Sequence, residues 1–205
     1  MLDGIDSIDW ASLRHAYGSA ADVPELLGAL ASSDEEKRKK AIYELFGNIW
    51  HQGTVYPATE AAVPFLYELL NAPSVPAKSE IAGLLACIAA GSGYLEVHSV
   101  GDFGEKTWRK ILSERGKSLE EEVEREATEI NGVRRAAATR LLDLLPYLHD
   151  PEPENRRVIA EAFGCYPEFK TKTLPELRKA AKSETDEEVQ EALSESIERL
   201  EEAED

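Results

Sequence analysis

The chain has 205 residues, of which 42% are hydrophobic and 31% charged, and its 40 acidic and 23 basic side chains give a formal net charge of −17. This length is enough to bury a sizeable core, and the composition is typical of a globular protein. Proteins bind nucleic acid largely by neutralising phosphates with Lys and Arg, so the charge argues against a nucleic-acid partner. Two interpretations of the acidic surface stay open: it confers solubility, which we favour for most of it, or it is suited to a basic protein partner.

The sequence carries no sign of a membrane or export segment. Its longest apolar run, residues 81–90, covers ten residues, too few to span a bilayer. The N-terminus has acids where a signal peptide would carry bases, so we expect no export signal. Cys87 and Cys165 lie within helical patterns and resemble small buried hydrophobes, which fits a reducing compartment. We therefore expect a cytoplasmic protein without membrane contact.

Apolar side chains recur at helical spacing along most of the chain, and strand-like alternation is nearly absent. This periodicity predicts an all-α fold. We expect one domain, built in chain order from an N-terminal capping helix in 7–21, helical repeats in 22–50 and 57–90, a glycine-rich insertion in 91–104, an irregular acidic helical unit in 105–132, a further repeat in 133–165 and a C-terminal capping repeat in 173–203.

Local signals set the expected helix ends. Capping-box patterns, in which an N-cap acceptor is followed three residues later by Glu, predict helix starts at Asp22, Ser33, Thr173 and Thr185. Pro64 predicts a kink or a restart near Ala61. Asn131-Gly132 predicts a turn. The four glycines of 91–104 predict a loop with a brief extended piece.

Part of the helical pattern repeats. Pro24-Glu25-Leu26-Leu27 recurs in form as Pro64-Phe65-Leu66-Tyr67 and as Pro175-Glu176-Leu177-Arg178, and the first two copies are 40 residues apart. A period near 40 built from two helices is typical of a helical solenoid. In such a fold, stacked helix pairs present an extended concave surface.

These units resemble HEAT repeats. A leading Pro-x-Leu helix and a short turn precede a helix with a basic residue shortly before a buried small one. Asp34, Arg38 and Ala41 carry that pattern in one unit, and Pro151, Arg156, Ile159 and Ala160 carry it in another. Gly47 to Thr59, followed by Ala62-Val63-Pro64-Phe65-Leu66, looks like an uncharacterised bacterial subgroup of the PBS-lyase HEAT-like, armadillo-like proteins. The resemblance implies a right-handed superhelix of antiparallel helix pairs, and it brings no activity with it.

The most distinctive stretch is Gly47 to Thr59, where aromatic, imidazole, amide and hydroxyl side chains crowd between helices. One interpretation is a patch that binds a partner, formed by Trp50, His51, Gln52, Thr54 and Tyr56. The other, which we favour, is a joint that closes the core between two repeats. Catalysis by the imidazole would need a nucleophile or an acid within hydrogen-bond reach, and no such motif accompanies it.

The remaining histidines give little support for a site. His15, His51, His98 and His149 share no ligand-like spacing, so we expect no metal and no cofactor. His98 lies with Glu96 and Asp102 in the glycine-rich insertion and is a candidate partner-binding residue. An ordinary polar loop is the favoured interpretation there.

Two acidic surfaces stand out in the sequence. The first lies on the expected helix after Ser118 and the second at the end of the chain, and their members are Glu120, Glu121, Glu122, Glu124, Glu198, Glu201 and Glu202. Either acidic surface could bind a basic protein. Acids in first helical turns also complement the helix dipole without any partner, and those of the last helix could simply face solvent on a capping repeat.

Taken together, the residues predict a non-catalytic protein–protein interaction module, an adaptor or scaffold rather than an enzyme. The alternative is an immunity-type inhibitor that neutralises a basic toxin through its acidic face. The resemblance also allows two weaker enzymatic alternatives, because some HEAT-like folds are alkylpurine DNA glycosylases and others resemble bilin lyases. Oligomeric state and partner identity are open at this point.

Overall fold

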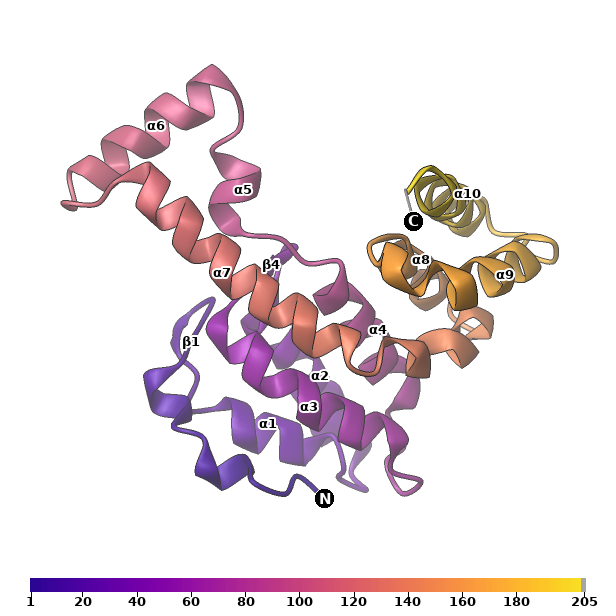
Figure 1. The fold of residues 1–205 in the computed structure, drawn as a ribbon. Coiled ribbons are helices and arrows are strands. Elements are labelled where there is room, and N and C mark those ends of the chain that lie inside the picture. The colour runs from indigo at the N-terminus through magenta and orange to yellow at the C-terminus, as the bar shows by residue number, and fades with distance from the viewer. Residues whose placement is uncertain (204–205) are drawn as a thin grey trace.

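The computed structural model describes residues 1–203 and is mostly helical, which confirms the all-α prediction. Ten α-helices follow one another through these residues (Figure 1): α1 (Val23–Ala29), α2 (Glu35–Asn48), α3 (Pro57–Asn71), α4 (Lys78–Ala89), α5 (Tyr94–His98), α6 (Gly101–Ser113), α7 (Leu119–Ala138), α8 (Pro153–Gly164), α9 (Lys170–Ala181) and α10 (Glu187–Glu202). Four 3₁₀ segments accompany them: η1 (Ile5–Ser7), η2 (Trp10–Ser12), η3 (Leu141–His149) and η4 (Pro167–Phe169).

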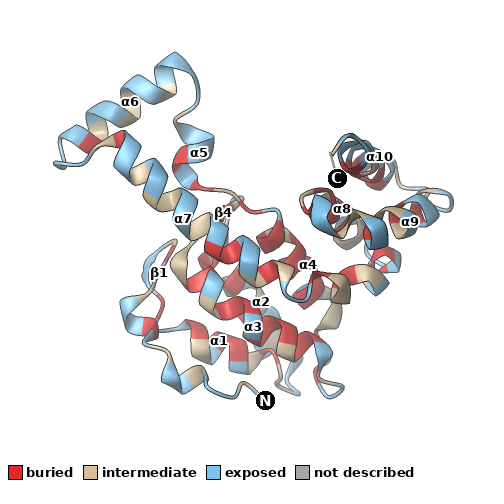
Figure 2. Cartoon of the chain, viewed as in Figure 1, coloured by how far each residue is buried: buried red, intermediate tan, exposed pale blue. Residues whose placement is uncertain are grey.

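The helices pack in sequential pairs, α1 with α2, α3 with α4, η3 with α8, and α9 with α10. Neighbouring pairs contact one another through equivalent members. The first members lie side by side in the order α1, α3, α7–η3 and α9, and the second members lie in the order α2, α4, α8 and α10. Buried residues gather on the helix faces that meet between the pairs (Figure 2).

A hydrogen bond recurs in three of the pairs. Arg38, Arg156 and Gln190 each lie four residues after the N-cap of their helix. Each side chain donates to the carbonyl oxygen six residues earlier, in the turn that precedes the helix, at 2.8, 2.8 and 2.7 Å respectively. The residue three positions further on is at most 2% exposed in every case (Ala41, Ile159, Leu193). We refer to this contact as the turn clamp.

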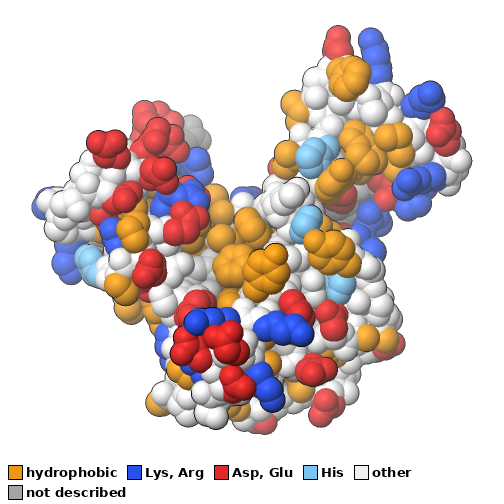
Figure 3. All heavy atoms as spheres, turned by 180° about the vertical axis from the view of Figure 1, so that it is seen from behind, with side chains coloured by type: hydrophobic (Ala, Val, Ile, Leu, Met, Phe, Trp, Pro, Cys, Tyr) orange, Lys and Arg blue, Asp and Glu red, His pale blue; other side chains and the backbone are white. Residues whose placement is uncertain are grey.

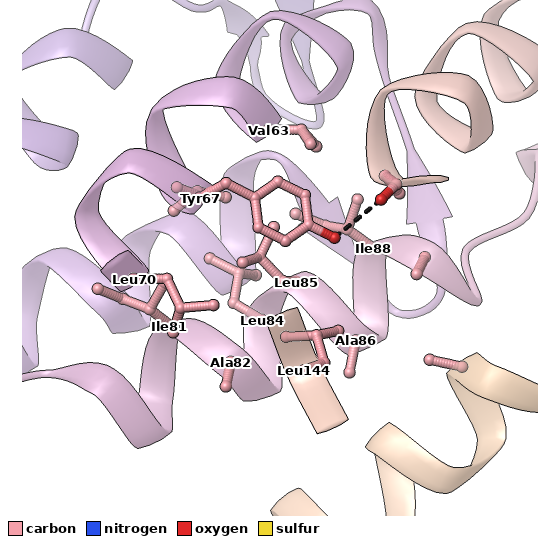
Figure 4. Close-up of a cluster of buried hydrophobic side chains, with 14 of the residues drawn as sticks. Val63, Tyr67, Leu70, Ile81, Ala82, Leu84, Leu85, Ala86, Ile88 and Leu144 are labelled. Carbon is pink, nitrogen blue, oxygen red and sulfur yellow. Dashed lines mark hydrogen bonds between the residues drawn. The ribbon is translucent and has the colours of Figure 1, made fainter. Parts of the chain in front are cut away.

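The core runs through all the pairs as one cluster that extends from Trp10 to Leu200. At its centre, fully buried Tyr67 lies among the aliphatic side chains of α3 and α4 (Figure 4). Its hydroxyl group donates to the carbonyl oxygen of Ala137 at 2.8 Å, which satisfies the buried donor and ties α3 to α7. Burial raises the pKa of Tyr67, so the hydroxyl keeps this proton.

The predicted capping helix of 7–21 is wrong. This segment forms η1 and η2 and a small hairpin of β1 (Arg14–His15) and β2 (Gly18–Ser19). The reason is a polar network that the helical pattern does not reveal. Buried His15 accepts from the backbone N–H of Tyr17 through Nδ1 (3.0 Å), so its Nε2 carries the proton and donates to Asp22 (3.0 Å). The other oxygen of Asp22 accepts from Asn48 (2.7 Å), and the Asp22 side chain therefore caps no helix.

The predicted turn at Asn131-Gly132 is also wrong, because α7 continues through it. A Cβ atom at Gly132 would lie 2.2 Å from a carboxylate oxygen of Glu60. The glycine thus leaves room for the Glu60 side chain, which comes from α3, and it does not mark a turn. Leu141 to His149, expected to continue as α-helix, is the 3₁₀ segment η3.

Other helix ends depart from expectation in smaller ways. Helix α3 runs without a break through Pro64, where no restart occurs, and the flanking Val63 and Phe65 are buried. Helix α9 begins at Lys170, before the expected cap at Thr173. The side chains of Asp34 and Asp186 do cap α2 and α10, as the sequence patterns around them predict within one residue.

The glycine-rich insertion is largely helical. It holds α5 and the start of α6, where a loop was expected. Helices α5 and α6 and the first half of α7 form an arm that projects from the body (Figure 1). The arm has a small core of its own, in which Leu95, Leu112 and Leu119 are buried together beside Trp108.

Among the described residues 1–203, no helix is long and apolar enough to cross a membrane.

The best-formed ion pair predicts how stability depends on pH. Glu184 accepts two hydrogen bonds from the guanidinium of Arg156 (2.7 and 2.9 Å), and these lower its carboxyl pKa from 4.5 to about 2. A depressed pKa stabilises the fold above pH 4.5 and stops doing so as the pH falls towards 2. After discounting for solvent screening, we expect the free energy of unfolding to fall by about 1–2 kcal/mol between pH 4.5 and pH 2.

Urea unfolding of the wild type and of Glu184→Gln at a series of pH values measures this loss of stability. The variant should be weaker at neutral pH and show a flatter profile below pH 4.5, and identical profiles would contradict the assignment.

Candidate functional site

The stretch from Gly47 to Thr59 forms a two-residue β-hairpin between α2 and α3. Strand β3 (Trp50–His51) pairs with β4 (Thr54–Val55). Gln52 and Gly53 form the turn with φ of 50° and 90°, the left-handed pair that a tight hairpin turn of type I′ requires. The strands are too short for their alternation to stand out in the sequence, so only the glycine signalled the turn.

This hairpin also bonds to the chain just after α4. Val55 donates its backbone N–H to the carbonyl of Ser92 (3.1 Å), and Ser92 donates in turn to Gly53 (2.9 Å), just after α4. The hydroxyl group of buried Thr59 donates to the carbonyl of Ile49 and accepts from the backbone N–H of Tyr56 (2.8 Å). These bonds tie the hairpin to the helix ends around it.

Trp50 lies half-buried at the base of the hairpin. Its ring meets Phe46 edge to face, with centroids 5.9 Å apart. Its indole Nε1 is buried and has no hydrogen-bond partner among the described residues. A buried N–H group without an acceptor lowers the stability of the folded state unless another group accepts its hydrogen bond.

His51 lies at the rim of the hairpin. Its Nδ1 is 3.1 Å from the carbonyl oxygen of Gly47, which can only accept, so Nδ1 carries the proton of the neutral ring. The hydroxyl of exposed Tyr17 lies 3.4 Å from the same nitrogen, and the two rings meet edge to face. This contact links the hairpins β1–β2 and β3–β4.

A cavity of about 330 Å³ opens where the β3–β4 hairpin meets the arm. It is lined by Arg14, Ala16, His51, Thr54, Val55, Tyr56, Gly93, Tyr94, Glu126, Glu129 and Ile130. Three residues of the predicted partner-binding set therefore come together here. Trp50, Gln52 and His98 lie outside the lining, and His98 packs on Tyr94 with ring centroids 4.2 Å apart.

The charged groups of this cavity are mostly paired with the protein itself. Glu129 binds Arg14 (3.3 Å) and Arg125. Glu126 accepts the backbone N–H of Leu95 at the start of α5 (2.8 Å), and burial raises the pKa of its carboxyl group. Burial also raises the pKa of Tyr56. These contacts hold the arm against the body.

No serine or cysteine lines this cavity, and the described residues contain no cluster of three or more His, Cys, Asp or Glu side chains arranged for a metal. Cys87 is elsewhere, in α4, and burial raises the pKa of its thiol to about 12, so the reactive thiolate does not form at neutral pH.

A second concave site lies between α8 and α10. This groove has a volume of about 430 Å³ and is lined by Glu154, Arg157, Glu161, Glu188, Glu191, Ala192 and Glu195. It thus carries five carboxylates against a single guanidinium. Arg157 is already bound to both Glu154 (2.6 Å) and Glu161 on its own helix. We refer to it as the acidic groove, and acidic side chains crowd the lobe that contains it (Figure 3).

The groove differs from the acidic surfaces that the sequence singled out. Glu120 binds Arg109 (2.6 Å), Glu122 binds Lys117 (2.9 Å) and Arg125 (2.8 Å), and Glu201 binds Arg178 (2.7 Å). The other predicted members, Glu121, Glu124, Glu198 and Glu202, are exposed and lie outside the groove.

The groove residues that sequence reasoning missed have a recognisable spacing. On α10, the residues Glu188, Glu191 and Glu195 are separated by three and then four positions. On α8, the residues Glu154, Arg157 and Glu161 have the same spacing. This spacing places each set on one face of its helix. The adjacency of the two faces depends on the packing of α8 against α10 and is not visible in the sequence.

Comparison of the chain with protein-family models and with curated proteins finds no match.

Trp50 provides a test of the joint. Trp50→Ala should lower the free energy of unfolding by about 3 kcal/mol, since it removes a large packed ring. Trp50→Phe should stay within about 1 kcal/mol of the wild type, because it keeps an aromatic ring beside Phe46 and removes the unpartnered N–H. Urea unfolding measures both.

The control is Tyr43→Ala on α2, where the side chain is 79% exposed and the change should be within about 0.5 kcal/mol. If Trp50→Ala were as mild as this control, the ring would not belong to the joint, and a role in partner contact would be favoured.

Proposed function

We propose that this protein is a non-catalytic binding module, a HEAT-like α-solenoid adaptor whose partner is a basic protein. The turn clamp supports the repeat interpretation, because the same donor position, acceptor position and buried residue recur in three helix pairs. The parallel ordering of first and second helices supports it too. Both are expected of stacked repeats, in which each pair contacts its neighbours.

The acidic groove is the observation that carries the proposed partner class. The carboxylates of Glu188, Glu191 and Glu195 make no ion pair among the described residues, so α10 presents three uncompensated charges on an exposed face. A surface of one sign raises the local concentration of an oppositely charged partner and speeds its association. A DNA glycosylase of the HEAT-like kind would need a basic cleft, and this groove has the opposite sign.

Exposed aromatic side chains supply a second kind of contact. Tyr17 and Tyr43 are 70% and 79% exposed, and Tyr43 lies on α2, a member of the same layer of second helices as α8 and α10. Hydrophobic side chains gather in the hollow between the acidic lobe and the arm (Figure 3). Aromatic anchors beside charged groups are typical of protein interfaces.

An inhibitor of a basic toxin is a second version of the same proposal. The same unpaired glutamates and the overall charge of −17 favour it. Long-range electrostatic attraction makes the association of a basic toxin with such a surface fast and dependent on salt. The two versions differ in the partner and share the binding surface.

The test is affinity capture from the native host, followed by kinetics with the purified partner. We expect the partner to be basic and the triple variant Glu188→Gln, Glu191→Gln, Glu195→Gln to bind it about tenfold more weakly, mainly through slower association. Raising the salt concentration should slow association of the wild type much more than that of the variant.

The matched control removes three exposed carboxylates elsewhere, with Glu121→Gln, Glu124→Gln and Glu168→Gln, and should bind like the wild type. An acidic partner, an association rate that ignores salt, or equal losses in both triple variants would each refute the proposal.

A further inference from the structure

The outer face of α6 combines an exposed aromatic side chain with unpaired basic ones. Phe103 is 85% exposed, the highest value among the large hydrophobic side chains of the described residues. Lys106 and Lys110 are exposed and make no ion pair within that part of the chain. Spacings of three and four residues place all three side chains on one face of the helix.

This face is not used by the fold. The opposite side of α6 supplies Trp108 and Leu112 to the small core of the arm, where they meet Leu95 and Leu119. Phe103, Lys106 and Lys110 therefore point away from the small core of the arm.

The acidic groove has the complementary chemistry and length. Glu188 and Glu195 are seven residues apart on α10, and Phe103 and Lys110 are seven residues apart on α6. At 1.5 Å of rise per residue, each stretch is about 10.5 Å long. Lys106 and Lys110 can thus lie against the three unpaired glutamates of α10.

The arm and the acidic groove of one chain lie apart. Figure 1 shows the arm at the upper left and the helices α8 to α10 at the upper right, both rising from the body below, and the reverse view of Figure 3 shows a hollow between the two. We propose that the outer face of α6 in one copy of this protein docks into the acidic groove between α8 and α10 of a second copy. This inference rests on the groove of the proposed function and names one partner for it.

Such a contact joins two different surfaces, so it is head-to-tail. Each copy keeps a free arm at one end and a free groove at the other, and the assembly grows into rings or open chains. A basic partner that enters the groove would displace the arm of the neighbouring copy. Self-association and partner binding are then mutually exclusive at that site.

Sedimentation velocity of the full chain at about 0.15 M salt, where charge repulsion is screened beyond roughly 8 Å, tests the inference. The wild type should associate as its concentration rises. Lys106→Glu with Lys110→Glu, and separately Glu188→Lys with Glu191→Lys, should each weaken association about tenfold or more. The matched control, Lys172→Glu with Lys182→Glu, reverses two exposed lysines outside both surfaces and should associate like the wild type.

A mixture of the two charge-reversed variants is the decisive sample. The unchanged basic arm of the groove variant meets the unchanged acidic groove of the arm variant, and the two reversed surfaces also match, so association should return. Circular dichroism of each variant checks that it is folded.

A wild type that stays monomeric at every concentration overturns the inference, and so does association that survives both reversals or a mixture that stays monomeric. If the monomeric protein still captures a basic partner through Glu188, Glu191 and Glu195, the proposed function stands while self-docking fails. If the protein self-associates through these surfaces but no basic partner binds the groove, self-docking stands while the proposed function fails.

Discussion

The turn inside each helix pair exposes backbone carbonyl groups that no helix uses, and the arrangement of the pairs depends on how these groups are satisfied. Arg38, Arg156 and Gln190 solve this with one geometry, a side chain of the second helix that reaches back to the turn. In the α3–α4 pair the ammonium group of Lys78 does so from another position, with bonds to Leu69 (3.0 Å) and two further carbonyls. The contact fixes how the second helix leaves the turn, which brings successive second helices into one layer.

The acidic groove is a consequence of that layer. Because α8 and α10 leave equivalent turns in equivalent ways, their outward faces lie next to one another, and carboxylates from two distant segments meet. Arg156 adds a second constraint, since it bonds both the turn before α8 and Glu184 in the turn before α10. A concave surface formed by stacked helix pairs needs no specialised loop. The three- and four-residue spacing of the charged side chains therefore indicates the acidic groove better than any sequence motif does.

Sequence reasoning succeeded where structure is set locally. The all-α class, and the start of α2 within one residue of the predicted cap at Ser33, follow from periodicity and capping alone. It failed where a contact distant in sequence decides. Gly132 reads as a turn because its role depends on Glu60 from another helix, and the N-terminal segment reads as helix because the bonds of His15 involve Asp22.

The candidate sites show the same division. The hairpin at Gly47 to Thr59 was recognisable as a special stretch, and its glycine marked the turn. Its cavity was not foreseeable, since five of its eleven lining residues lie between Gly93 and Ile130, in a region that composition predicted to be loop and irregular helix. Likewise, the number of acids on a helix did not identify an available acidic surface. Glu120 and Glu122 have basic partners nearby, and a binding partner would compete with those.

The unpaired glutamates of α10 weigh against the stability of the helix that carries them. Like charges three and four residues apart repel by a few tenths of a kcal/mol per pair, and Glu188, Glu191 and Glu195 form such a series. Glu188 at the first turn is favoured by the helix dipole, but Glu195, near the middle of α10, is not. Nor does any base of α8 offset the series, because Arg157 is engaged by Glu154 and Glu161. A cationic surface laid along the groove removes this repulsion, so the fold is more stable with the groove occupied than with it empty. That coupling would add to the binding free energy of any cationic partner, beyond what its individual contacts supply.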